Sequence, residues 1–391
     1  MEKLGKNADM AVAGGDFSQT FSRQTISVFI PVYEGSDLLE PLLEKLTGGC
    51  CEYDVEFFVV IDKPNGESLR IAERFRNRVH FVLNEERLGK VEALNRAVKL
   101  SRGEIFVFLD ADVIVKDAVE FFRVVREALS DADIVDLKKK ILLNSFISRM
   151  VNYEYVGSNF ASYLFSKLVG KCIGIGGTAF AIRRETFEEV GGFSRVVSED
   201  LDLALKTLLK NKRFKYEGRV EVYTEAPSTW IGWLNQRKRW GVGTGLWIKE
   251  NWRKLICYIA KYPYVAFPCA VMVFPTIMPL LLSYVCSSLL GKQFQNMVPT
   301  VLAAQLSSLQ ISNVIPSSLL SIILTVLTNF VLGFAAFSIV FYLVSRRLGF
   351  RFNIAEFMVY YFVYQPIATL VLFAGILKAL IFQNHKLDWK V

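Results

Sequence analysis

Histidine is nearly absent from this chain of 391 residues, which contains only His80 and His385, far apart in the sequence. This scarcity argues against a multi-histidine zinc site and a Ser-His-Asp triad, so a divalent metal is expected to bind carboxylates. The six cysteines include no CxxC pair and show no regular spacing. They are therefore predicted to be free thiols in a reducing compartment.

Charged residues are missing from three long stretches after residue 261, which cover residues 262–291, 293–345 and 357–377. A helix needs about 20 apolar residues to cross the hydrocarbon core of a bilayer, so each stretch is long enough. We predict an α-helical transmembrane region over residues 262–391. Its three expected spans lie near residues 262–290, 318–344 and 356–382.

The topology of this region depends on residues 293–317, which are uncharged but rich in Gln, Ser, Asn and Pro. We predict an outer amphipathic segment here, with a fourth span as the alternative. With three spans the basic loop at residues 346–351 faces the cytosol, whereas four spans would turn it outward, against the positive-inside rule. Residues 1–24 resemble a disordered arm, and no apolar span is visible before residue 25. We therefore expect a cell-membrane protein with a cytosolic catalytic domain.

Many of the basic residues behind the net charge of +8 gather just before the first predicted span. They are interleaved with Trp233, Trp240, Trp247 and Trp252, and amphipathic aromatic and cationic side chains are typical of a membrane border. Residues 229–261 are therefore predicted to form interface helices in contact with membrane lipids. Nucleic acid is not an expected partner.

Residues 25–228 alternate short apolar runs with helical patterns. Strands are predicted at residues 26–33, 55–61, 79–83 and 104–109, and helices at residues 37–47, 67–77 and 90–101. This alternation predicts an α/β domain with a mainly parallel sheet covered by helices on both faces. Ligands bind beyond the carboxyl ends of such strands, and Asp62 and Asp110 lie at two of these ends.

The segment Asp110-Ala111-Asp112 directly follows a predicted buried strand. In extended backbone, side chains two residues apart point the same way, so both carboxylates can bind one hard cation. Mg²⁺ or Mn²⁺ prefers to bridge carboxylates and the phosphates of a nucleoside diphosphate. A solvated acidic turn is the alternative, but the position after a strand favours a metal and nucleotide site.

Two further polar clusters follow. One covers residues 198–203, where helix capping by Ser198 accounts for one acid but not for the whole set. A carboxylate there would take a proton from an acceptor, while a metal at Asp112 neutralises a leaving group. The other covers residues 236–240, where Gln, Arg and Trp suit a diphosphate and a sugar, although a basic membrane-border helix explains Lys238 equally well.

Eight motifs occur in a fixed order along residues 25–260. They are Ile-Pro-Val-Tyr-Glu (30–34), Val-Val-Ile-Asp (59–62), Gly-Lys-Val-Glu-Ala-Leu-Asn (89–95), Asp-Ala-Asp (110–112), Gly-Gly-Thr (176–178), Arg-Arg-Glu-Thr-Phe-Glu-Glu-Val-Gly-Gly-Phe (183–193), Ser-Glu-Asp (198–200) and Gln-Arg-Lys-Arg-Trp (236–240). In this combination the chain resembles the family 2 inverting glycosyltransferases, in particular the membrane-embedded branch with cellulose, hyaluronan and poly-N-acetylglucosamine synthases. The resemblance implies a GT-A-like fold.

The resemblance also implies a role for each matching residue. Asp200 would be the catalytic base, and Asp112 would ligate Mg²⁺ or Mn²⁺ together with the donor diphosphate. The UDP-sugar would be bound by Asp62, Lys90, Asp110, Gln236 and Arg239. The acceptor side would be lined by Gly176, Gly177, Thr178, Glu199 and Trp240.

The chain departs from the family pattern at Lys63, where a second acid is common, and at Ser198, where Thr is common. With about three spans, a polymer channel would require a homo-oligomer. The predicted acceptor is a glycan, and single-sugar transfer to a polyprenyl phosphate or a glycolipid is the alternative. A non-enzymatic nucleotide-sensing membrane protein is less favoured, because the acidic and Gln-Arg-Trp motifs occur together.

Overall fold

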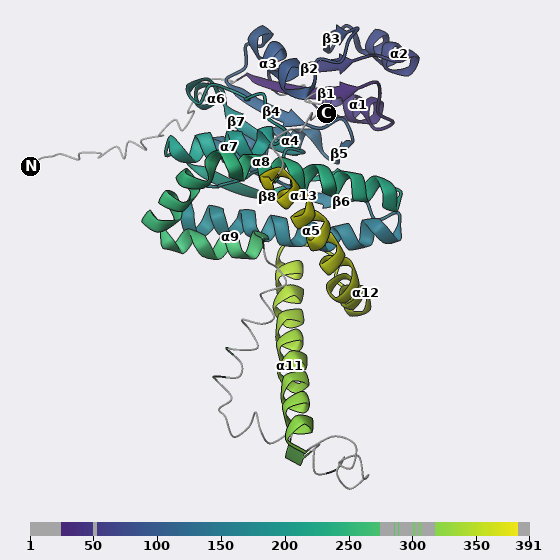
Figure 1. The fold of residues 1–391 in the computed structure, drawn as a ribbon. Helices are drawn as coiled ribbons and strands as arrows, with labels where there is room; N and C mark the ends of the chain where they lie inside the picture. The colour runs from purple at the N-terminus through teal and green to yellow at the C-terminus, as the bar shows by residue number, and fades with distance from the viewer. Residues whose placement is uncertain are drawn as a thin grey trace, which may run out of the picture.

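The computed structural model describes residues 25–49, 53–273 and 317–381, together with five isolated positions between 285 and 305. The predicted arm, nearly all of segment 293–317 and most of the first predicted span therefore lie outside the described residues. Figure 1 shows a layered α/β body from which α11 (Ser317–Arg347) projects as one long helix.

The centre of the described body is a sheet in the order β3-β2-β1-β4-β7-β6-β8-β5. Strands β1 to β4 run parallel to one another, β6 and β8 are also parallel, and β7 is antiparallel to both of its neighbours. The strands are β1 (Ile26–Tyr33), β2 (Val55–Asp62), β3 (His80–Asn84), β4 (Ile105–Leu109), β5 (Val113–Val115), β6 (Ile134–Ile141), β7 (Ala179–Arg183) and β8 (Phe214–Thr224).

Helices cover both faces of this sheet. The body contains α1 (Leu39–Gly48), α2 (Gly66–Phe75), α3 (Lys90–Leu100), α4 (Ala118–Ser130), α5 (Phe146–Leu164), the π-helix η1 (Phe165–Val169), α6 (Arg184–Glu189) and α7 (Glu199–Leu209). After them come α8 (Trp230–Lys261), η2 (Pro263–Val265), α9 (Ala266–Val273), α11, α12 (Ile354–Val359), the π-helix η4 (Tyr360–Tyr364) and α13 (Gln365–Ile381). Every element predicted before residue 110 is present, and its bounds shift by two residues at most, as in α1.

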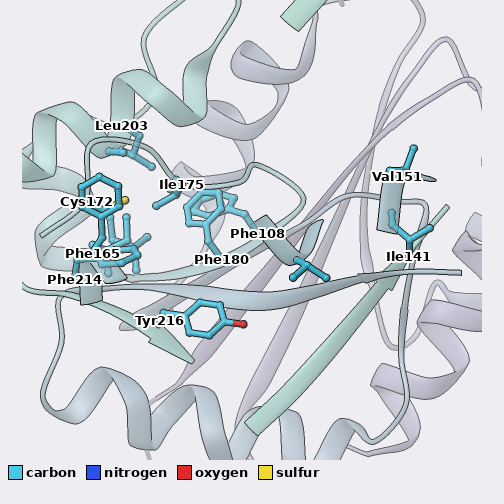
Figure 2. Packing of buried hydrophobic residues seen from close by; sticks show 14 of the residues in the cluster. Phe108, Ile141, Val151, Phe165, Cys172, Ile175, Phe180, Leu203, Phe214 and Tyr216 are labelled. Carbon is cyan, nitrogen blue, oxygen red and sulfur yellow. The ribbon is translucent and has the colours of Figure 1, made fainter. Parts of the chain in front are cut away.

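Alternate residues of the central strands pack into two separate hydrophobic clusters. Val28 of β1 and Val107 of β4 face α1, α2 and α4, whereas Phe29 and Phe108 of the same strands face α3, α5, α6 and α7. Figure 2 shows part of the second cluster, in which Phe108 and Phe180 stack with ring centroids 4.9 Å apart. The predicted α/β architecture, with helices on both faces of the sheet, is thus confirmed.

The cysteines that the structure describes are free thiols, as predicted. They are Cys172, Cys257 and Cys269. Cys172 is buried among the aromatic side chains of the second cluster (Figure 2), and burial raises the pKa of its thiol. It therefore packs as a small apolar group.

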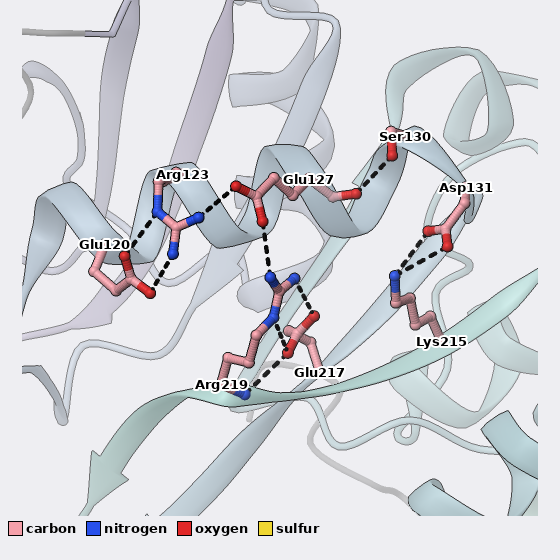
Figure 3. Close-up of polar contacts among 8 residues, drawn as sticks. All are labelled: Glu120, Arg123, Glu127, Ser130, Asp131, Lys215, Glu217 and Arg219. Carbon is pink, nitrogen blue, oxygen red and sulfur yellow. Dashed lines mark hydrogen bonds and ion pairs between the residues drawn. The ribbon is translucent and has the colours of Figure 1, made fainter.

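Ion pairs join α4 to β8 on the outer surface (Figure 3). Arg123 pairs with Glu120 and Glu127 along α4, and Arg219 reaches from β8 to Glu127 and Glu217. Exposed pairs of this kind contribute only about 0–1 kcal/mol each. The hydrophobic clusters, rather than this network, hold the helices on the sheet.

Two described helical stretches are long and apolar enough to cross a membrane, Ile322–Arg347 and Ile354–Ile381. They coincide with the second and third predicted spans. Their surroundings differ: 17% of the most apolar part of the first stretch is buried in the protein, compared with 33% in the second. Figure 1 shows the reason: α11 projects from the body, whereas α13 lies along α8.

Glycines allow α8 and α13 to approach each other backbone to backbone. A Cβ atom on Gly241 would lie 2.5 Å from the carbonyl oxygen of Leu372, and one on Gly245 would lie 2.8 Å from that of Ile376. The body and the C-terminal helices also share one hydrophobic cluster, which extends from Phe108 to Tyr364. The helix that carries residues 236–240 is therefore fixed against an apolar helix.

We expect Gly241→Ala to lower the free energy of unfolding by about 1–3 kcal/mol, because the new methyl group would overlap a backbone oxygen. Thermal unfolding of the full-length protein in detergent, followed by circular dichroism, measures the change. Gly157→Ala in α5 is the matched control, since a Cβ there meets nothing within 4 Å. Equal stability of Gly241→Ala and the wild type would contradict the close crossing.

Candidate active site

A small cavity opens beyond the carboxyl ends of β1 and β4. Its lining comes from three strands (β1, β4 and β7), from α3 and α7, from the turn before β7 and from the segment between α6 and α7. The lining residues are Pro31, Lys90, Leu94, Phe108, Leu109, Asp110, Gly177, Phe180, Phe193, Glu199 and Asp200. Five of the predicted site residues (Lys90, Asp110, Gly177, Glu199 and Asp200) thus meet in one place, although they lie far apart in the sequence.

Lys90 joins the two acidic clusters. Its ammonium group lies 2.8 Å from Oδ1 of Asp110, at the end of β4, and 3.2 Å from Oε1 of Glu199, at the start of α7. Burial opposes the charge of Lys90, but the carboxylates of Asp110 and Glu199 overcome this and raise its pKa. Lys90 therefore remains a cation beside the cavity.

Asp200 sits in the first turn of α7, and backbone groups fix its carboxylate. Oδ2 accepts a hydrogen bond of 3.0 Å from the N–H of Gly177, and Oδ1 accepts one of 2.8 Å from the N–H of Leu201. Burial and the neighbouring Glu199 raise the pKa of Asp200 to about 6. The Ser198 side chain makes no capping hydrogen bond, so capping does not explain this acidic segment.

The turn at residues 176–178 connects the two acidic segments from the other side. Asp110 donates its backbone N–H to the carbonyl of Thr178 at 2.9 Å, and Gly177 donates to Asp200. A Cβ atom on Gly176 would lie 3.0 Å from the Lys139 ammonium. A side chain at Gly176 would therefore push against a buried lysine. Gly177 and Thr178, two of the predicted acceptor-side residues, contact the acidic segments through backbone groups.

Asp112 lies beside this cavity rather than in its lining, and its side chain is exposed. Surrounding protein atoms and the charge of Asp110 nevertheless raise its pKa to about 6. Within the described residues, no group of three or more His, Cys, Asp or Glu side chains forms a ready metal site. Residues 111 and 112 form a turn before β5 rather than the predicted extended backbone, and Asp110 is paired with Lys90. Binding of one cation by both carboxylates therefore stays a prediction.

The carboxylate of Asp62 accepts hydrogen bonds from other parts of the chain. One carboxylate oxygen accepts from the backbone N–H groups of Leu88 (3.0 Å) and Gly89 (2.7 Å), and the other accepts from the Asn84 side chain at 2.9 Å. Asp62 therefore fixes the loop that leads into Lys90, and it does not line the cavity.

The backbone after β1 and after β2 adopts a left-handed conformation at residues that are not glycine. Glu34 has φ of 61° and Lys63 has φ of 53°. Each such residue costs roughly 1–2 kcal/mol, and hydrogen bonds from Glu34 N to Asp62 O and from Lys63 N to Asn84 O hold them in place. The fold therefore maintains strained turns at the edge of the sheet that borders the cavity.

The motif on α8 lies outside the cavity lining, but one of its faces is turned toward α7. Gln236, Arg239, Trp240 and Gly243 share a helix face, since one turn takes 3.6 residues. A Cβ atom on Gly243 would lie 2.5 Å from the Ser198 hydroxyl, two residues before Asp200. Arg239 and Trp240 are exposed on this face.

Sequence reasoning missed Arg237, which is only 2% exposed and pairs with Glu154 of α5. Its spacing from Trp233 and Trp240, by four and three residues, places all three on neighbouring positions of the helix and was the available signal. Its partner could not be read from the sequence.

Comparisons with known proteins show similarity to glycosyltransferases. Residues 27–191 match the sequence model of glycosyl transferase family 2. The chain is 24% identical over 263 residues to the poly-beta-1,6-N-acetyl-D-glucosamine synthase of Staphylococcus epidermidis, across 62% of this chain and 61% of that protein. It is 37% identical over 84 residues to the probable glucomannan 4-beta-mannosyltransferase 6 of Oryza sativa subsp. japonica, across 21% of this chain and 15% of that protein. The chain thus spans less than two thirds of the length of either relative.

Among solved structures, the chain resembles the mannosyltransferase PcManGT from Pyrobaculum calidifontis in complex with GDP-Man and Mn²⁺. The TM-score is 0.51 at 19% identity, and the likeness covers 81% of this chain and 87% of that one. It confirms the predicted GT-A-like fold.

The raised pKa of Asp200 predicts a gain in stability for Asp200→Asn. The pKa rises from 3.8 to about 6 on folding, so the folded state binds more protons between these values, and the stabilising effect of the bound proton is lost as the pH rises from about 4 to about 6. We expect Asp200→Asn to be more stable than the wild type at pH 7.5 by up to about 3 kcal/mol, because each pKa unit corresponds to about 1.4 kcal/mol. Urea unfolding measures the difference, which should vanish at pH 4. A variant that is less stable than the wild type at pH 7.5 would contradict the destabilising effect of the ionised Asp200 carboxylate.

Proposed function

We propose, on the premise that this chain contains a family 2 glycosyltransferase domain, that it is a membrane-bound inverting glycosyltransferase. It moves a sugar from a UDP-sugar to a glycan acceptor. The observation that carries the proposal is the single cavity in which Lys90 bridges Asp110 and Glu199 beside Asp200.

Asp200 is the proposed general base. Its pKa of about 6 suits this role, because the carboxylate is ionised at neutral pH but holds a proton more tightly than an ordinary aspartate. Asp200 takes the proton of the acceptor hydroxyl while that oxygen attacks the anomeric carbon from the face opposite the diphosphate. The N–H groups of Gly177 and Leu201 keep the carboxylate in one orientation during this step.

The leaving diphosphate is held on the other side of the cavity. Lys90 and Asp110 line the nucleotide side, and Gln236 and Arg239 of α8 contact the diphosphate. Asp112 would hold Mg²⁺ or Mn²⁺, and the ion would supply positive charge that stabilises the diphosphate leaving group. Support for a metal comes from the two carboxylates at the end of β4 and from the Mn²⁺ in the complex of PcManGT.

Asp62 acts on the nucleotide pocket through the loop that it fixes. Three hydrogen bonds from Asn84, Leu88 and Gly89 occupy its carboxylate. A direct contact with the uracil or ribose therefore requires this loop to move, and we propose loop positioning as its first task.

The acceptor is a growing glycan, bound along Gly176–Thr178, Glu199 and Trp240. The relationship to the poly-beta-1,6-N-acetyl-D-glucosamine synthase supports this choice. Transfer of one sugar to a polyprenyl phosphate or a glycolipid is the second candidate, and it is favoured by the presence of only two candidate spans in the described part of the chain. Labelled UDP-sugars, followed by sizing of the product and lipid extraction, separate the two: a polymer supports the glycan acceptor.

We expect Asp200→Asn to lower the transfer rate by about 10²–10⁴-fold, because the general base is lost, while UDP binding is retained. Release of UDP from a panel of UDP-sugars measures transfer, and calorimetry measures binding. Asp202→Asn is the matched control, since Asp202 lies in the same helix turn but pairs with Lys206 at 3.0 Å. Normal turnover in Asp200→Asn would remove Asp200 from the mechanism.

We expect Asp112→Ala to abolish the part of UDP affinity that depends on Mn²⁺, because one of the two proposed carboxylate ligands is lost. Titration calorimetry with and without Mn²⁺ measures both affinities. Asp131→Asn is the control, since its carboxylate only forms an exposed pair with Lys215. An unchanged response to Mn²⁺ in Asp112→Ala would argue against the metal assignment.

A further inference from the structure

The most deeply buried charge on α8 is Arg237, with an exposed fraction of 2% among the described residues. Three chain segments surround it. Its guanidinium pairs with Glu154 of α5, and it donates to the Tyr364 hydroxyl of η4 at 3.4 Å. Trp233 of α8 donates its indole N–H to the same hydroxyl at 2.6 Å. Arg237 therefore stands where the catalytic domain, the motif helix and the C-terminal apolar segment meet.

Stability alone does not account for this buried pair. Taking an arginine and a carboxylate out of water costs about as much as their attraction returns, and apolar residues of similar volume serve a fold equally well. The site is otherwise aromatic, with Trp233, Trp240 and Tyr364 around the cation. A guanidinium is required only if its directed hydrogen bonds and its flat face orient neighbouring side chains.

Arg237 contacts two such side chains, those of Gln236 and Trp240. One guanidinium nitrogen donates to the side-chain oxygen Oε1 of Gln236, so the amide nitrogen is the end of Gln236 that remains to donate to another group. The guanidinium also lies 4.3 Å from the ring centroid of Trp240, which fixes the plane of the indole. Gln236 and Trp240 are both on the helix face that is turned toward α7.

The cluster also lies close to the acidic end of β4. Tyr155 follows Glu154 on α5 and is partly buried. Loss of solvent raises the pKa of Tyr155, and the charges of Arg237, Asp112 and Asp110 all act on it. The Arg237 cluster and the Asp110–Asp112 segment therefore lie within electrostatic range of the same side chain.

We propose that Arg237 is a positioning residue for sugar transfer: held by Glu154 and Tyr364, it orients the Gln236 amide toward the donor diphosphate and the Trp240 indole toward the acceptor. This role rests on the proposed function. It makes the C-terminal apolar segment part of the active-site support, because the Tyr364 hydroxyl fixes both Arg237 and Trp233.

A double-mutant cycle on the full-length protein in detergent tests the role. We expect Arg237→Lys, which keeps the charge but loses the forked geometry, to lower kcat/KM by about 10²-fold, the usual effect of a misplaced contact. In a Gln236→Ala, Trp240→Phe background the same change should have almost no further effect, because the residues through which Arg237 acts are gone. Losses that multiply in the two backgrounds would show a general structural role and overturn the proposal.

Matched controls separate this role from damage to the helix. Lys238→Ala removes the neighbouring exposed cation of α8 and should leave kcat/KM unchanged. Tyr364→Phe should lower kcat/KM, whereas Tyr361→Phe, in the same π-helix, should not. Arg237→Lys should also change the tryptophan emission of the wild type more than that of Trp240→Phe, in which only Trp233 still lies beside the guanidinium. Unchanged emission, or wild-type activity in both Arg237→Lys and Tyr364→Phe, would overturn the proposal.

The same assays distinguish failure of this inference from failure of the proposed function. If the wild type transfers sugar and Asp200→Asn does not, the function stands and the variants of Arg237 decide the inference. If the wild type itself transfers no sugar from any UDP-sugar tested, the proposed function fails, and the role of Arg237 in transfer fails with it.

Discussion

One buried ammonium group, that of Lys90, holds the two acidic segments of this protein together. Without it, Asp110 at the end of β4 and Glu199 at the start of α7 would bring like charges into one cavity, next to Asp200. The pKa values reflect this arrangement of charges: the neighbouring carboxylates raise the pKa of Lys90, while burial and Glu199 raise that of Asp200 to about 6. The cation permits three carboxylates to share a small space, and each remains available for a different task.

The position of Lys90 depends in turn on the strand ends. Asp62 fixes the loop before α3 with three hydrogen bonds, and Lys90 is the first residue of that helix. The left-handed Glu34 and Lys63 lie at the same edge of the sheet. The strained turns, the loop bound by Asp62 and the Lys90 cation thus all lie at the carboxyl ends of the strands of a GT-A-like sheet.

Much of this arrangement could be predicted from the sequence. The first four strands were recognisable because buried parallel strands appear as apolar runs that stop at polar turn residues. The same logic placed Asp110 at a strand end, and the motif order linked it to Asp200. The partners of Lys90 and Arg237 were not predictable, because they depend on which distant segments approach each other. The position of Asp62 at a strand end was also predictable, but its hydrogen bonds to Asn84, Leu88 and Gly89 were not.

The Tyr364 hydroxyl lies 127 residues beyond Arg237 in the sequence. During synthesis the motif helix therefore leaves the ribosome long before its last partner exists. A nascent chain that ends before η4 contains Arg237 without its Tyr364 partner, and it contains Gly241 and Gly245 without the α13 backbone that packs against them. The packing of the helix that carries residues 236–240 is therefore completed only after η4 and α13 have been synthesised.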